Sequence, residues 1–138
     1  MNIFILDFDQ KKSAQYHVDK HIVKMPLETA QLLCTVHHCV GNEAPYKKTH
    51  VNHPCSIWAR KSLANYNWLV DMGLELCYEY SYRYGKVHKC QFVIEWCQKK
   101  IPNIPDVGLT AFAQAMPSQY KRINVVEAYS LPIENPRL

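Results

Sequence analysis

Glycine is scarce in this sequence, and its scarcity excludes one class of nucleotide-binding protein. The chain has only four glycines among 138 residues, and they are widely scattered. A phosphate loop of the P-loop type needs glycines close together, so that backbone N–H groups can surround the phosphates. Hydrolysis of nucleoside triphosphates by such a loop is therefore not expected.

Long apolar runs and a secretory signal are also missing. No run of roughly 18 apolar residues occurs, so we expect no membrane-spanning helix and no membrane partner. The apolar start Met1–Leu6 is followed at once by Asp7 and Asp9, with no basic segment before it and no small-residue cleavage site after it. These features predict a cytoplasmic protein.

Cysteine is plentiful, but the spacing of the six cysteines matches no paired metal motif. They are Cys34, Cys39, Cys55, Cys77, Cys90 and Cys97. An even count is typical of disulfide-bonded secreted proteins. Because no secretory signal is seen and 48% of the residues are hydrophobic, enough for a substantial core, we expect free, buried thiols.

The charge balance is mildly basic. Sixteen Lys and Arg face 12 Asp and Glu, a net charge of +4, which permits an anionic partner without requiring one. Several basic residues come in pairs, as a bland surface would also show. The length predicts a single domain over residues 1–138.

Apolar residues recur at helical spacing through most of the chain. We predict an all-α fold, a compact bundle of three to four helices with a short extended N-terminal segment. The expected segments are an extended stretch at 1–7, helices at 13–40, 54–84 and 88–99, a loop at 101–117 and a last short helix at 123–129. A kink or break is expected at Pro26, because proline lacks the backbone donor that a helix interior needs.

A polar row follows one face of the first predicted helix. Its members are His17, His21, Lys24, Glu28, Gln31 and Thr35, spaced by three or four residues. The row borders the apolar face, so its side chains are expected at the edge of the core. A carboxylate held there beside cations can act as an acid, a base or an electrostatic stabiliser. A solvated face with ordinary helical ion pairs is the alternative.

A second candidate surface is aromatic and basic. The segment 78–88 contains four tyrosines together with Arg83, Lys86 and His88, which could bind an anion while aromatic rings stack on bases. Alternate tyrosines of a helix cannot all face one site, so some are expected in the core. Arg60 and Asn65 offer a further polar edge on the same predicted helix.

Histidine and cysteine together raise the question of zinc. His17 and His21 are four residues apart, and further histidines lie beside Cys39 and Cys55. Neither a Cys-x-x-Cys pair nor a His-Glu-x-x-His motif is present, so we assign no metal ligand. A zinc-stabilised interaction protein stays open as an alternative.

Several strings resemble one protein family. They are Asp19–Met25, Leu27–Gln31, His53-Pro54, Trp58–Arg60, Asn65-Tyr66, Glu79-Tyr80, Arg83–Lys86 with His88, and Ala115–Pro117. The chain resembles, to about Tyr129, the small phage-encoded pyrimidine-dimer DNA glycosylases of the endonuclease V type, which repair ultraviolet damage.

The resemblance implies a helical fold, DNA as the partner and no cofactor. It implies that the N-terminal amine, on Met1 or Asn2, attacks the sugar C1′ to give a Schiff base. Glu28 and His21 match the family's catalytic glutamate and helical histidine, and Glu28 would stabilise the charged sugar through the lyase step. The protein would then work in the cytoplasm of a phage host.

Three features mark the chain as a divergent member. Asn2 follows Met1 where the family has a small residue, Lys24 is the only cation on the Glu28 face, and the last nine residues lack a basic-aromatic tail. The same features leave a second class of function open, in which the protein binds, sequesters or degrades a small signalling nucleotide.

Overall fold

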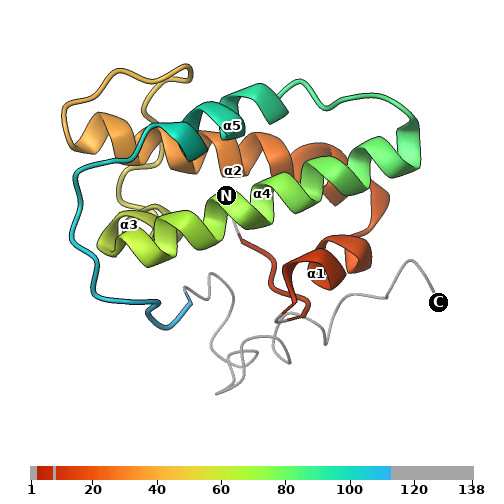
Figure 1. Cartoon of the computed structure of the whole chain (residues 1–138), viewed down its shortest axis with the longest axis horizontal. Helices are drawn as coiled ribbons and strands as arrows, with labels where there is room; N and C mark the ends of the chain where they lie inside the picture. Colours follow the sequence, from red (N-terminus) through yellow and green to blue (C-terminus); the bar gives the residue numbers. More distant parts are fainter. Residues whose placement is uncertain (1–2, 8, 113–138) are drawn as a thin grey trace.

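The computed structural model describes residues 3–7 and 9–112, and within them the fold is all-helical, as predicted. Five helices follow an extended N-terminal segment (Figure 1). They are α1 (Gln10–Tyr16), α2 (Asp19–Cys39), α3 (Pro54–Lys61), α4 (Leu63–Tyr84) and α5 (Gln91–Lys99). The helix expected at 123–129 lies outside the described residues.

The first predicted helix is two helices, and the break is not at the proline. His17 and Val18 are extended, with ψ angles of 138° and 157°, so α1 ends before them and α2 begins after them. The His17 ring accounts for the break, since its Nδ1 lies 2.7 Å from the Ser13 carbonyl oxygen. Pro26 lies buried inside an unbroken α2, so the expected break there was wrong. Packing of the whole helix outweighs one missing backbone hydrogen bond.

The second predicted helix also divides, at Ser62. This residue is extended at φ −150° and ψ 144°, between the end of α3 and the start of α4. A distant segment provides the replacement hydrogen bonds: Leu63 N–H donates to the Pro105 carbonyl at 2.8 Å, and Val107 N–H donates to Ser62 Oγ at 3.0 Å. The break therefore depends on residues more than 40 positions away.

Helices α2 and α4 form the centre of the bundle, and α1, α3 and α5 pack around α4 (Figure 1). The main core cluster includes Leu32 and Leu33 from α2, Leu69 from α4 and Ile94 from α5. Gly73 lets the helices approach closely, because a Cβ atom there would lie 2.7 Å from Thr29 Cγ2 and 3.0 Å from Ile94 Cδ1. Among the described residues, no helix is both long and apolar enough to cross a membrane.

A buried polar chain links α2, α4 and α5. The Asn42 amide N–H donates to His37 Nδ1 at 3.2 Å, His37 Nε2–H to the Tyr66 hydroxyl at 2.8 Å, and that hydroxyl to the Cys97 carbonyl at 2.6 Å. This order follows from the last acceptor, since a carbonyl oxygen cannot donate. His37 thus serves the core as a neutral imidazole.

We expect Gly73→Ala to destabilise the fold by about 1 kcal/mol. An alanine gains about 1 kcal/mol of helix propensity, but overpacking against Thr29 costs roughly 1–3 kcal/mol. Urea unfolding measures the change. Adding Thr29→Ser removes the opposing methyl group and should restore most of the loss; strictly additive effects of the two substitutions would contradict the proposed steric contact.

Candidate active site

The extended N-terminal segment packs across the start of α2. The Phe4 ring stacks on the His21 ring at a centroid distance of 4.7 Å and an interplanar angle of 27°. Behind it, Leu6 N–H donates to Ser13 Oγ at 3.1 Å, and Ile3 and Ile5 are buried. The described chain therefore starts beside the polar row of α2.

His21 is half-buried at this point of contact. Its Nδ1 atom is buried and has no hydrogen-bond partner within residues 3–7 and 9–112. Burial lowers the pKa of the His21 imidazole, and Lys20 and Lys24 lower it further, while the Glu28 carboxylate acts in the opposite direction. The ring is thus a neutral group at neutral pH, with a carboxylate close enough to affect it.

His53, which the sequence analysis did not assign to the site, approaches the same carboxylate. Its Nδ1 accepts the Cys55 backbone N–H at 3.1 Å, so His53 is the N-cap of α3. The neutral ring therefore carries its proton on Nε2. Burial lowers the pKa of His53, while Glu28 again favours the charged form. The signal in the sequence was a His directly before a Pro, at a helix start.

The Cys55 thiol connects His53 to the N-terminal segment. Burial raises its pKa, a backbone hydrogen bond from Ile3 lowers it, and Glu28 raises it. Ile3 therefore lies against the first turn of α3, while Phe4 lies against α2. The charge of the Glu28 carboxylate raises the pKa of His21, His53 and Cys55, so these three groups lie within electrostatic range of it.

This region can support acid–base and electrostatic chemistry. Glu28 is half-buried, in the second turn after His21, and can stabilise positive charge on a reacting group. The two imidazoles are held in place, one by ring stacking and one by a helix cap. Met1 and Asn2, the predicted sources of the amine, lie outside the described residues.

Lys24 and Gln31 lie on the same helix as Glu28. Lys24 is exposed, and Gln31 borders a surface cavity of about 370 Å³ between α2 and the following loop. The other residues that line this cavity are Leu27, Tyr46, Lys47 and Thr49.

Four of the predicted binding residues make contacts that hold the fold together. His17 is buried against Ser13. The buried Asn65 amide donates from Nδ2 to the Trp58 carbonyl and to the Thr110 hydroxyl, and its Oδ1 accepts the Thr110 N–H. His88 joins α2 to the start of α5, since its Nε2–H donates to the Val23 carbonyl at 2.8 Å and its Nδ1 accepts the Cys90 N–H at 3.0 Å. Arg60 donates to the Val51 carbonyl at 2.7 Å and to Ser56 Oγ at 3.1 Å.

Arg83 and Lys86 lie at the far end of α4. Arg83 donates to Asp19 Oδ1 at 2.9 Å and to the Gln15 carbonyl at 3.0 Å, and its Nε lies 3.6 Å from the buried Glu79 carboxylate. Lys86 is exposed just after the Gly85 cap. The structure therefore does not bring the aromatic-basic segment to Glu28, and a role for it in binding stays a prediction.

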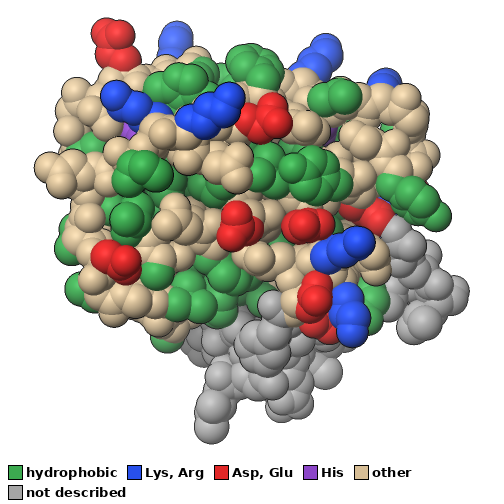
Figure 2. Space-filling view, in the orientation of Figure 1, with side chains coloured by type: hydrophobic (Ala, Val, Ile, Leu, Met, Phe, Trp, Pro, Cys, Tyr) green, Lys and Arg blue, Asp and Glu red, His purple; other side chains and the backbone are tan. Residues whose placement is uncertain are grey.

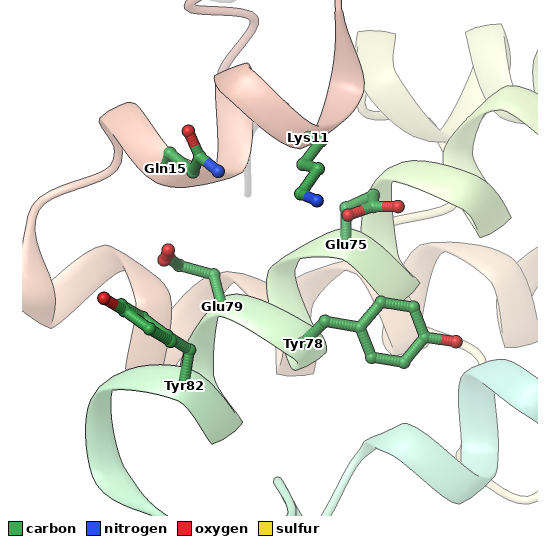
Figure 3. A pocket seen from close by; sticks show the side chains of 6 residues that line it. All are labelled: Lys11, Gln15, Glu75, Tyr78, Glu79 and Tyr82. Carbon is green, nitrogen blue, oxygen red and sulfur yellow. The ribbon is translucent and has the colours of Figure 1, made fainter.

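A separate pocket of about 350 Å³ lies between α1 and α4 (Figure 3). Lys11 and Gln15 line it from α1, and Glu75, Tyr78, Glu79 and Tyr82 line it from α4. Two glutamates make it a poor site for phosphate. Within the part of the chain that the structure describes, no three His, Cys, Asp or Glu side chains are grouped as metal ligands, so the zinc alternative gains no support.

The fold and the site define an all-helical protein with a carboxylate and two imidazoles beside its N-terminal segment. Residues 1–92 match the family model described as pyrimidine dimer DNA glycosylase. The match covers more than half of the 138 residues, and the chain belongs to this family. The family is one of DNA-repair enzymes, whose substrate is DNA. Neither the comparison with curated proteins nor that with solved structures gives a match.

Acid should destabilise the fold through its buried histidines. Burial lowers the pKa of His17 and of His37 from 6.5 to about 4. The unfolded chain takes up these protons near pH 6.5 and the folded chain only near pH 4, so stability is complete above about pH 6.5 and falls as the pH drops through this window. Each imidazole contributes up to roughly 1.4 kcal/mol per pH unit.

Urea unfolding at several pH values between about 7 and 5 measures this loss. His17→Gln removes one of these titrating groups, so its free energy of unfolding should depend less steeply on pH than that of the wild type. A free energy of unfolding that is constant or rises on acidification would contradict the assignment.

Proposed function

We propose that this protein is a DNA glycosylase with abasic-site lyase activity on damaged pyrimidines. An N-terminal amine would be the nucleophile, and Glu28 the residue that stabilises charge. The observation that carries the proposal is the stacking of the Phe4 ring on His21, which places the N-terminal segment against the helix that holds Glu28.

Covalent geometry favours the terminal amine as the nucleophile. Two residues span at most about 7 Å, so an amine on Met1 or Asn2 has a short reach from the Ile3 nitrogen. Ile3 is buried in the same core cluster as Cys55, two residues after His53. We therefore take the amine to act beside this N-terminal segment, whichever of the two residues carries it.

The proposed reaction begins with attack of the neutral amine on the sugar C1′. The new N–C1′ bond forms as the bond from C1′ to the base breaks, and the base leaves with that electron pair and takes up a proton. Loss of an amine proton and opening of the C1′–O4′ bond then give the Schiff base. The ionised Glu28 carboxylate stabilises the positive charge that develops on the sugar and on the imine nitrogen.

The lyase step removes a proton from C2′ and breaks the C3′–O bond, so that the 3′ phosphate leaves with the electron pair. Glu28 is the nearest candidate base, because its carboxylate already faces the charged imine in this scheme. Duplex DNA must expose the sugar for the amine to reach C1′, which requires a distorted or flipped nucleotide. Hydrolysis of the imine would then release the enzyme.

Borohydride trapping on abasic-site duplex DNA tests this proposal. The wild type should form a covalent adduct on its N-terminal residue, located by the intact mass and by peptide mapping. Glu28→Gln should reduce turnover by roughly 10²–10³-fold, the range seen when one electrostatic stabiliser is removed. Glu75→Gln, the same chemical change in the α1–α4 pocket, serves as the matched control and should leave turnover unchanged.

Folded wild-type protein that gives no adduct would overturn the Schiff-base mechanism. An adduct on an internal lysine would keep the lyase activity but reject the terminal amine. Equal losses in Glu28→Gln and Glu75→Gln would remove the specific role of Glu28.

A further inference from the structure

Within residues 3–7 and 9–112, the two arginines are not available to bind DNA phosphates near Glu28. Arg60 and Arg83 are engaged with protein carbonyl, hydroxyl and carboxylate groups. Lys24 is exposed on α2, and Lys47 and Lys48 are exposed on the loop between α2 and α3. The exposed lysines of this loop are therefore candidates to bind phosphates near Glu28, a role that no sequence pattern indicated.

The loop is held rigidly at the positions on either side of its two lysines. His38 Nε2–H donates to the Tyr46 carbonyl at 2.8 Å, and the Tyr46 hydroxyl lies 3.3 Å from Cys90 Sγ. The Thr35 hydroxyl donates to the Thr49 carbonyl and accepts the Thr49 N–H, both at 3.1 Å. Lys47 and Lys48 therefore project from a fixed backbone, so binding through them orders little additional chain.

The loop runs from the cavity beside α2, which Lys47 lines, to His53 at the start of α3. At one end, Lys47 shares the cavity of about 370 Å³ with Leu27 and Gln31, one residue before and three residues after Glu28. At the other end, His53 N–H donates to the His50 carbonyl at 3.0 Å, and the His53 ring caps α3. The Nε2–H group of the neutral ring is then the hydrogen-bond donor of His53, and the Glu28 carboxylate lies within electrostatic range of the ring.

The α4 face carries negative charge at its pocket. The pocket between α1 and α4 contains Glu75 and Glu79, which repel phosphate. Figure 2 shows several carboxylates across the middle of that face, with basic side chains beside and above them. A duplex that approached α4 at this pocket would therefore meet like charges.

We propose that the loop Tyr46–His53 is a phosphate-binding arm for the DNA strand that enters the Glu28 site. Lys47 and Lys48 bind backbone phosphates through charge, and His53 Nε2–H donates to the phosphate next to the sugar at Glu28. This inference rests on the proposed function, since it takes Glu28 as the reacting centre.

The test measures binding to a duplex that carries a tetrahydrofuran abasic analogue, which cannot form a Schiff base. Fluorescence anisotropy at several salt concentrations gives the slope of log Kd against log salt. The double variant Lys47→Ala with Lys48→Ala should lower the magnitude of this slope by about 2, because each lost phosphate contact removes about one released counterion. Lys11→Ala with Lys12→Ala removes the same charge on α1 and should leave the slope unchanged.

His53→Asn tests the other end of the loop. Asparagine is a good N-cap, so the stability of α3 is retained while the Nε2–H donor is lost. We expect this variant to bind the abasic duplex more weakly while its unfolding transition is unchanged. Its slope of log Kd against log salt should stay within about one unit of the wild-type slope. Wild-type affinity in a normally folded His53→Asn protein would reject the His53 contact.

A wild-type salt slope in the Lys47/Lys48 variant would overturn the proposed arm. So would an equal change in the Lys11/Lys12 variant, which would show only a general effect of net charge. Because the analogue does not react, a distinct loss of slope together with failed borohydride trapping would keep the arm and reject the proposed chemistry.

Discussion

The close contact between α2 and α4 at Gly73 is the constraint on which the site depends. With no side chain at Gly73, Thr29 of α2 packs directly against the backbone of α4. This contact fixes the rotation of α2 about its own axis. Glu28, one residue earlier, is then held at the edge of the core, half-buried and near His21 and His53. The position of the carboxylate follows from helix packing rather than from a local motif.

Buried polar groups divide into those that fix the fold and those that border the site. His37, Tyr66 and Asn65 have their polar atoms satisfied by neighbouring helices and loops, as burial requires. His21, by contrast, keeps a buried nitrogen without a partner within the described part of the chain. An orphaned polar atom beside a half-buried carboxylate is more typical of a reactive region than of a structural one.

The histidines show how one residue type serves several physical roles here. His17 ends α1 by bonding to the Ser13 carbonyl, His53 begins α3 as its N-cap, and His88 joins the start of α5 to α2. Each role uses the ring as a neutral donor or acceptor, so each depends on a tautomer set by its partners.

The sequence by itself determined the helical class, the polar row of α2 from His21 onward and the family, because these depend on periodicity and on local strings that survive divergence. His17, predicted in the same row, lies in the break before α2. It also placed Glu28 and His21 on one helix. Tertiary structure decided where the helices break, since Ser62 is held extended by Pro105 and Val107 from a distant segment. It also decided that Arg83, His88 and Asn65 hold the fold together, whereas His53 approaches Glu28. Such pairings join residues far apart in the chain, and no local pattern encodes a contact whose partner is chosen by packing.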